Sequence, residues 1–268
     1  MPVSIRLFGR KILYCPYSFG ESLTPPSRLS SFYGKGNAVA LGNHMVNSFI
    51  SIAGLKPDEK VLDVGCGIGR VALPLTGYLG NKGQYYGFDI VPEGIKWCKK
   101  NIEPKFPHFH FQQADIYNRF YNPKGKYKAS EYRFPFNDNT FDFIYLTSVF
   151  THMLTKDLQH YMSEVSRVLK DDNGRCFITY FLINLDTLQL MNEGRSHGNF
   201  RYMLDEHCYS LTDSDPERAV AYDETFIRGI YKENNLDIIE PLHYGSWRVN
   251  QPTLDFQDVI VASRSGQK

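Results

Sequence analysis

The stretch that most restricts the fold of this chain is residues 61–70, VLDVGCGIGR. A short apolar run leads into three glycines at alternate positions, and a helical pattern begins directly afterwards. The apolar run is typical of a buried parallel strand. Glycines in the turn let the backbone approach a ligand closely, and the first N–H groups of the following helix point to the same place. The sequence therefore predicts a strand–turn–helix unit that holds a nucleotide-type ligand.

One interpretation of this turn is a dinucleotide site. The pattern Gly67-x-Gly69-x-x-Ala72 satisfies the dinucleotide fingerprint, and Asp89 lies 20 residues after Gly69, where an acid that binds a ribose is expected. This interpretation gives no role to Asp63. A carboxylate in the last turn of a central strand is costly unless it has a partner. NAD(P) therefore remains an alternative that explains only part of the motif.

The longer pattern Asp63-x-Gly65-x-Gly67-x-Gly69 resembles the S-adenosylmethionine (SAM) loop of class I methyltransferases. In that family the acid at this position binds the amino group of the methionine moiety, directly or through water. The resemblance thus implies a role for Asp63, and we favour SAM over NAD(P).

Composition limits the other classes of function. The chain has 268 residues, of which 42% are apolar and 22% charged, as in ordinary globular enzymes. A net charge of +1 gives no electrostatic sign of nucleic-acid or anionic-membrane binding. Five scattered cysteines suit a reducing compartment, and no apolar run approaches membrane-spanning length. We expect a cytoplasmic protein with no metal site and an unknown oligomeric state.

The second predicted strand, residues 84–90, ends in Asp89 and Ile90, and Pro92 then opens a helix. A carboxylate at this point can accept hydrogen bonds from both ribose hydroxyls of a nucleotide. It can alternatively cap the following helix. Hydrogen bonds to a charged acceptor contribute roughly 1.5–3 kcal/mol each, so Asp89 is able to dominate cofactor affinity.

The third predicted strand, residues 108–113, alternates polar and apolar side chains and is followed by Asp115 and Ile116. The resemblance implies that the Asp115 carboxylate meets the adenine amino group and that Ile116 flanks the adenine ring. Taken alone, this is a weaker signal, because an acid after a strand is common.

A polar turn over residues 134–140 leads into a fourth predicted strand that starts at Phe141. The same arrangement precedes the fourth strand of many small-molecule methyltransferases. Thr147, Ser148 and His152 follow at the carboxyl end of this strand, where open α/β sheets hold their ligands. His152 is able to accept a proton from an acceptor hydroxyl, or it only hydrogen-bonds the loop or supports the cofactor. Both interpretations stay open.

The predicted fifth strand covers residues 176–182, and residues 184–221 then form an unusually long connection. Long insertions in compact domains are usually functional, so we expect a substrate cap there, with a purely structural insertion as the alternative. A helix over residues 223–235 with Asp223 as its N-cap comes next, followed by strands over 236–244 and 255–262. This final strand pair suits the reversed last strand of the methyltransferase sheet.

Residues 1–36 are expected to form loops with at most a short helix, and residues 37–53 a helix. Together, residues 1–53 form a predicted N-terminal cover, which lies over the cofactor or only covers an edge of the sheet. In proteins that this sequence resembles, such segments lie over SAM, so Tyr33 and Gly34 are candidate contacts.

The resemblance to class I SAM-dependent methyltransferases covers roughly residues 37–183 and 223–264. It implies one α/β domain over 1–268: a doubly wound, mostly parallel seven-stranded sheet with a reversed last strand, an N-terminal helical cover and the cap after strand 5. We expect methyl transfer from SAM to a small molecule, with a hydroxyl acceptor favoured over an amine; a macromolecular acceptor is a further alternative. His152 is the candidate catalytic residue. The candidate cofactor-binding residues are Asp63, Gly65, Gly67, Gly69, Asp89, Ile90, Asp115, Ile116, Thr147 and Ser148.

Overall fold

Strand β3 (Lys60–Val64) carries the predicted ligand motif and is buried from Val61 to Val64, as a central parallel strand requires. The computed structural model describes residues 3–7, 10–14, 23, 25, 38–249 and 253–266. The chain folds as two compact units, Met1–Lys126 and Tyr127–Lys268.

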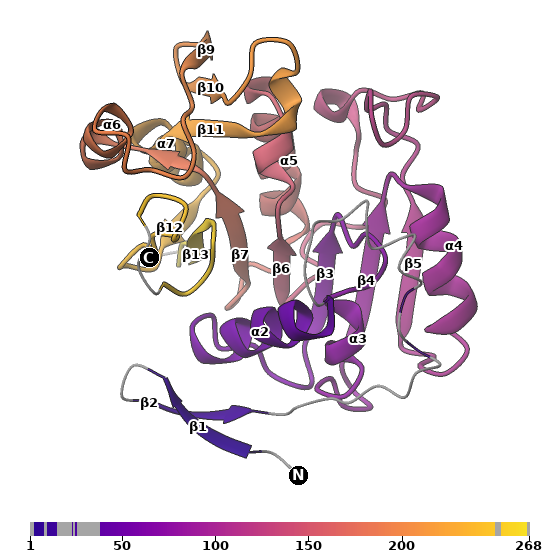
Figure 1. The fold of residues 1–268 in the computed structure, drawn as a ribbon. Coiled ribbons are helices and arrows are strands. Elements are labelled where there is room, and N and C mark those ends of the chain that lie inside the picture. Colours follow the sequence, from indigo (N-terminus) through magenta and orange to yellow (C-terminus); the bar gives the residue numbers. More distant parts are fainter. Residues whose placement is uncertain are drawn as a thin grey trace. The chain divides into compact units, whose positions relative to one another are not determined.

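The first unit contains the motif and its neighbouring strands. Its further elements are β1 (Val3–Leu7), β2 (Arg10–Tyr14), α2 (Ala38–Ser51), α3 (Ala72–Leu75), β4 (Gln84–Asp89), α4 (Pro92–Asn101) and β5 (Phe109–Gln113). Strand β4 pairs in parallel with both β3 and β5. Helix α4 begins with a proline and carries two lysines in its last turn, both of which favour a helix at those ends. It lies beside β4 and β5 (Figure 1).

Most elements of the first unit agree with the predicted ones. Helix α2 confirms the helix expected over residues 37–53, and the order strand, glycine turn, helix is confirmed around residues 61–75. The expectation of loops with at most a short helix over residues 1–36 was wrong for β1 and β2, which pair as an antiparallel hairpin. Each strand is only five residues long, and the Gly, Pro and Ser residues that follow dominate the local pattern.

The second unit begins in a loop. Its elements are η3 (Ala129–Glu131), β6 (Phe143–Leu146), η4 (Phe150–His152), α5 (Thr155–Val168), β7 (Arg175–Tyr180), β8 (Leu182–Ile183), α6 (Leu185–Asn192), β9 (Tyr202–Asp205), β10 (Cys208–Ser210), η5 (Pro216–Arg218), β11 (Val220–Asp223), α7 (Glu224–Glu233), β12 (Leu236–Ile238) and β13 (Asp258–Arg264). Strands β6 and β7 are parallel, whereas β13 is antiparallel to both β7 and β12. The reversed strand is therefore β13.

The seven-stranded sheet has the order β12-β13-β7-β6-β3-β4-β5. This confirms the predicted α/β class, with a mostly parallel sheet and one reversed strand near its end. The Asp223 carboxylate accepts a hydrogen bond from the Phe226 N–H at 2.8 Å, which confirms it as the N-cap of α7.

The predicted fifth strand was too long at its end. Strand β7 stops at Tyr180, because the Leu182 N–H turns aside to donate to the Asp258 carboxylate at 2.7 Å. Leu182 then enters β8, which belongs to a four-stranded sheet of order β8-β11-β10-β9 (Figure 1). This small sheet is formed largely by the segment that was expected to be an inserted cap. It has its own apolar cluster, whose buried members are Phe181, Ile183, Met191, Phe200, Ala221 and Trp247.

Candidate functional site

The turn after β3 is held open by glycine. Gly65, Gly67 and Gly69 have φ angles of 85°, 55° and 73°, in the left-handed region that other residues rarely adopt. The N–H groups of Gly65 and Cys66 both donate to the Phe88 carbonyl of β4, at 2.9 and 3.1 Å. Alternating glycines therefore fold the chain into a tight loop against the end of the neighbouring strand.

Gly69 is also needed for packing. A Cβ atom at this position would lie 2.9 Å from the Ile102 side chain and 3.1 Å from the Cys98 sulfur. Both contacts are closer than van der Waals distance, so any side chain here would push against α4 and the residue that follows it. This glycine allows the close approach between the loop and the helix.

Asp89 closes the loop from the side of β4. Its Oδ2 accepts the Gly67 N–H and its Oδ1 accepts the Val91 N–H, each at 2.8 Å, and the residue is buried. Burial raises the pKa of this carboxyl, while the backbone donors at Val91 and Gly67 act in the opposite direction. Each carboxylate oxygen has two lone pairs, so both can accept a further hydrogen bond from a ligand hydroxyl.

Asp63 lies in β3 with 2% of its surface exposed. Its Oδ2 accepts a hydrogen bond from the Tyr85 hydroxyl of β4 at 2.6 Å. The motif predicted Asp63 but gave no sign of Tyr85. A buried carboxylate is tolerated when such donors face it, and it is then suited to bind a cationic ligand group.

The remaining predicted cofactor residues of the first unit follow β4 and β5. Ile90 is half-buried and directly follows β4. The Asp115 side chain is 41% exposed, with its Oδ2 3.4 Å from the Lys126 ammonium group. Ile116 is buried, and its carbonyl accepts a hydrogen bond from the Asn122 side chain at 2.9 Å. These residues continue the carboxyl ends of neighbouring parallel strands, as predicted. The candidate contacts Tyr33 and Gly34 lie outside the described residues.

Thr147 and Ser148 follow β6 in the second unit. Ser148 has a φ of 59°, a conformation that costs a non-glycine residue about 1–3 kcal/mol and that clusters at functional sites. The Ser148 N–H donates to the Thr179 hydroxyl at 2.8 Å, and its own hydroxyl donates to the Gln257 side chain at 3.0 Å. Sequence reasoning found Ser148 but missed Thr179 and Gln257, which come from β7 and the approach to β13.

His152 ends the short helix η4. Its Nδ1 is 3.0 Å from the Glu217 carbonyl oxygen, and since a carbonyl only accepts, Nδ1 carries the proton. Burial lowers the pKa of this imidazole, although the Glu217 and Arg218 carbonyls and Asp215 favour its charged form. Burial therefore favours the neutral ring, in which Nδ1 carries the proton and Nε2 does not.

The segment between β7 and α7 is tied to η4 by further bonds. The Tyr222 hydroxyl of β11 donates to the carbonyl of Met153, the residue directly after η4.

Asp258 fixes the loop that carries Trp247: it accepts the Gly245 N–H at 2.7 Å, the Leu182 N–H at 2.7 Å and the Trp247 indole N–H at 2.8 Å. Burial raises the pKa of Asp258 to about 6.

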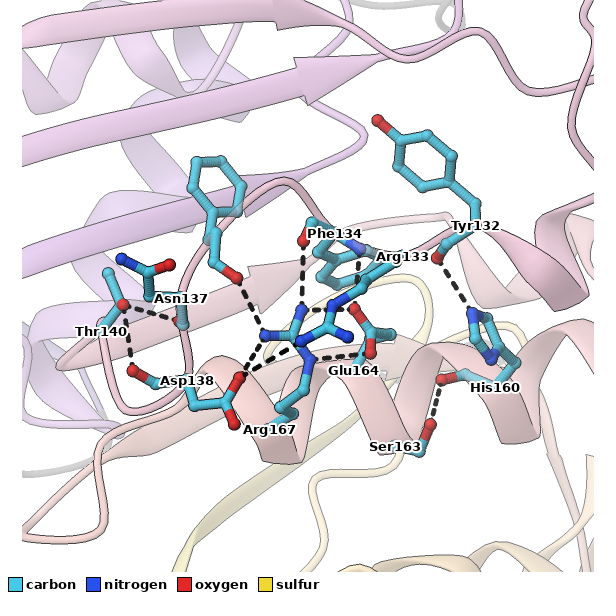
Figure 2. Close-up of polar contacts among 11 residues, drawn as sticks. Tyr132, Arg133, Phe134, Asn137, Asp138, Thr140, His160, Ser163, Glu164 and Arg167 are labelled. Atoms are coloured by element: carbon cyan, nitrogen blue, oxygen red, sulfur yellow. Dashed lines mark hydrogen bonds and ion pairs between the residues drawn. The ribbon is translucent and has the colours of Figure 1, made fainter.

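The polar turn before β6 is anchored to α5 by an arginine (Figure 2). The Arg167 guanidinium donates to the carbonyls of Phe134 and Phe136 and to the Asp138 and Glu164 carboxylates. The Glu164 carboxylate in turn accepts the Phe134 N–H at 2.7 Å. Burial raises the pKa of Glu164, but the hydrogen bonds from Arg167 and Phe134 bring it below its ordinary value. This network fixes the loop that leads into β6.

The donors and acceptors at the glycine loop fit SAM better than a pyrophosphate. In the dinucleotide interpretation, the loop N–H groups bind phosphate oxygens. Here the Gly67 N–H already donates to Asp89, and Asp63 places a second buried carboxylate in the loop region. Two carboxylates favour an ammonium group and hydroxyls over an anion.

Comparison with known proteins indicates a methyltransferase. A family model described as a methyltransferase domain matches residues 55–208. The 2-phytyl-1,4-naphtoquinone methyltransferase of Trichormus variabilis is 28% identical over 146 residues, which cover 53% of this chain and 57% of the relative. The demethylmenaquinone methyltransferase of Bacillus cereus is 29% identical over 119 residues, or 44% of each protein. The chain thus spans about half the length of these relatives.

Solved structures support the fold. A SAM-dependent methyltransferase from Aquifex aeolicus superposes with a TM-score of 0.52 at 18% identity, over 90% of this chain and 98% of that one. Because the family model matches more than half of its residues, the chain belongs to the methyltransferase-domain family. Its class is that of the Rossmann-like, class I SAM-dependent methyltransferases, and S-adenosyl-L-methionine is the cofactor implied.

Two further properties follow from the described part of the chain. None of its helices combines the length and apolarity that crossing a membrane requires. Within the same residues, no group of three or more His, Cys, Asp and Glu side chains is arranged to hold a metal ion.

Proposed function

We propose that this protein transfers the methyl group of SAM to a small-molecule acceptor and that it prefers a hydroxyl to an amine. The observation that carries the transfer reaction is the glycine loop with its two buried carboxylates, Asp63 and Asp89, in a chain of the methyltransferase family. Two relatives are named for quinone acceptors, which supports a small, largely apolar substrate.

SAM supplies an electrophilic sulfonium methyl group when it is bound, so the protein mainly has to orient the two reactants. Proximity and orientation contribute roughly 7–11 kcal/mol to such reactions. In this proposal Asp89 holds the ribose, Asp63 holds the amino group, and Asp115 and Ile116 contact the adenine. The sheet of residues 182–223 is proposed to cap the acceptor.

The preference for a hydroxyl rests on His152. A hydroxyl must lose its proton as it attacks, whereas a free amine is already nucleophilic. A positioned base contributes about 10²- to 10⁴-fold to such a step. In this proposal Nε2 of the neutral His152 ring, whose proton is on Nδ1, acts as the base. The Glu217 carbonyl fixes this tautomer.

The cofactor assignment is tested by thermal stabilisation. A ligand that binds the folded state raises the unfolding temperature, and at 100 times its Kd the gain is about 2.7 kcal/mol. We expect stabilisation by SAM and by S-adenosylhomocysteine, and none by NAD(H) or NADP(H). Stabilisation by a nicotinamide cofactor alone would revive the dinucleotide interpretation and contradict the proposal.

The acceptor is tested by replacing His152. A panel of phenols, hydroquinones and amines is screened with the wild-type protein, and His152→Ala is then measured on the best acceptor. We expect kcat to fall by about 10²- to 10⁴-fold on a hydroxyl acceptor with little change in substrate binding. The matched control is His160→Ala, because His160 also contacts a backbone carbonyl, that of Tyr132 at 2.9 Å, but lies on α5.

Two outcomes contradict the proposed acceptor, a small molecule with a hydroxyl group. If His152→Ala keeps turnover within a few fold, the general-base role is wrong and a nitrogen acceptor is favoured. If only a protein or nucleic acid is methylated, the acceptor is a macromolecule, although the net charge of +1 provides no attraction for nucleic acid.

A further inference from the structure

We propose that Tyr85 is a positioning residue: its hydroxyl aims the Asp63 carboxylate at the amino group of SAM, and Gly87 provides the space in which it does so. This inference rests on the proposed function, because it assumes that the glycine loop binds SAM. The family motif includes Asp63 but no group that orients it.

The register of the sheet shows why this contact needs a special arrangement. Asp63 on β3 is paired with Gly87 on β4, while Tyr85 is paired with Val61, two residues earlier. Side chains two residues apart lie on the same face of a strand. The Tyr85 ring must therefore extend along β4, past Gly87, for its hydroxyl to reach Asp63 at 2.6 Å.

Gly87 leaves the necessary space. A Cβ atom at this position would lie 2.7 Å from the Tyr85 hydroxyl oxygen and 2.9 Å from the Cys66 Cβ. Any side chain at residue 87 would collide with the hydroxyl at the place where it now lies. The missing side chain therefore serves the contact between Tyr85 and Asp63 as well as the approach of Cys66 in the loop.

The Tyr85 ring is held from the neighbouring strand β5. It stacks on Phe109, with ring centroids 4.8 Å apart and an angle of 18° between the planes. The centroid of the Phe111 ring lies 5.3 Å from that of Tyr85. Tyr85 has no exposed surface. Its hydroxyl thus has a fixed position, and the Asp63 carboxylate that accepts from it is fixed in turn. Preorganised charged groups of this kind bind their ligands without reordering.

A core aromatic would need no hydroxyl for packing alone, so removing the hydroxyl separates the two roles. Tyr85→Phe keeps the ring and its stacking partners. Hydrogen bonds to charged groups change equilibria by roughly tenfold or more. We expect Tyr85→Phe to weaken SAM and S-adenosylhomocysteine by about tenfold in calorimetry. 5′-Methylthioadenosine, which lacks the amino-acid moiety, should bind within about twofold of its wild-type affinity.

The control is Tyr86→Phe on the same strand. Tyr86 faces the opposite side of the sheet, and its hydroxyl is 3.3 Å from the Gln84 side chain. Tyr86→Phe should leave the affinities for SAM, S-adenosylhomocysteine and 5′-methylthioadenosine unchanged. If Tyr85→Phe does not give folded protein, Gly87→Ala is the second variant: its methyl group displaces the hydroxyl, although it also crowds Cys66 in the loop. A loss of affinity for SAM and S-adenosylhomocysteine that spares 5′-methylthioadenosine supports the inference, and an equal loss for all three ligands counts against it.

The outcomes separate this inference from the proposed function. If the wild-type protein binds none of the three ligands, the proposed function fails. If it binds all three, and Tyr85→Phe weakens 5′-methylthioadenosine as much as SAM, or weakens neither, then Tyr85 is only a core residue and the inference is overturned. Selective weakening of the two ligands with an amino-acid moiety supports it.

Discussion

The glycine loop of the first unit and the polar turn of the second unit both control backbone next to a central strand, but they do so by different means. The loop after β3 uses three left-handed glycines and receives one carboxylate, that of Asp89, on its Gly67 N–H. The turn before β6 has ordinary residues and depends on Arg167 and Glu164 of α5 (Figure 2). The Asp89 carboxylate of the loop thus meets neutral backbone donors, whereas the acceptors of the turn meet a charged side chain.

The difference shows how to separate a binding loop from a structural one. In the loop, the Asp89 carboxylate accepts from the Gly67 and Val91 N–H groups, and the Asp63 carboxylate accepts from the Tyr85 hydroxyl. In the turn, the donor is a cation: the Arg167 guanidinium donates to four neighbouring groups, two of which are the Glu164 and Asp138 carboxylates. Changes in the turn should therefore alter stability, and changes in the loop should alter cofactor affinity. The predictions below test this division.

The largest effect is expected for Arg167→Ala. The substitution leaves the largely buried Glu164 carboxylate, with a side chain 9% exposed, without its cationic partner. Breaking such a pair costs about 3–5 kcal/mol, measured as the free energy of unfolding in urea. SAM affinity should stay within about threefold at temperatures where the variant is folded.

The matched control for this variant is Arg133→Ala. The Arg133 side chain is 74% exposed and lies 3.8 Å from Asp138, so its loss should cost under about 0.5 kcal/mol. Equal effects of the two substitutions would show that the Arg167 network does not anchor the turn. A large fall in SAM affinity for Arg167→Ala would instead remove the distinction between the two regions.

A somewhat smaller effect is expected for Asp89→Ala. The variant loses the proposed hydrogen bonds to two ribose hydroxyls, worth roughly 1.5–3 kcal/mol each, and the support of Gly67. The Kd for SAM should rise about 10²-fold in calorimetry, with 5′-methylthioadenosine weakened as well. Glu93→Ala, which removes an exposed carboxylate from the first turn of α4, is the control. Unchanged SAM affinity in Asp89→Ala would remove the ribose assignment.

The smallest effect concerns Asp258 of the second unit. Like Asp89, it is a buried carboxylate that accepts hydrogen bonds from backbone N–H groups. Its pKa is raised to about 6 by burial, whereas an unfolded Asp titrates near 3.9. The folded state therefore binds the proton more tightly. The stabilisation from this group is complete below about pH 4 and is lost as the pH rises through about 6.

Asp258→Asn should remove this pH dependence. Between pH 4 and pH 7, the free energy of unfolding of the wild type should fall by on the order of 2 kcal/mol relative to that of Asp258→Asn. Urea titrations at several pH values measure it. Asp237→Asn, at an exposed position of β12, is the control. A difference that does not vary with pH would show that Asp258 titrates as it does in the unfolded chain.

Much of the fold was predictable because its signals are local. Apolar runs such as that of β3, the proline that opens α4 and the Asp223 N-cap each act within a few residues. The failures occurred where the local signal was weak or misleading. The N-terminal hairpin was expected to be loop, and β7 was extended through Leu182, which leaves the strand for a hydrogen bond with Asp258.

The glycine loop and the carboxylates at the ends of its strands could be predicted from the amino-acid sequence, because left-handed backbone and strand ends depend on neighbouring residues. The groups that contact those residues come from distant parts of the chain and could be found only in the folded protein. Tyr85 reaches Asp63 across 22 positions, Thr179 meets Ser148 across 31, and Gln257 meets Ser148 across 109. These contacts depend on strand register and on packing between distant segments, and neither is specified by any short stretch of the chain.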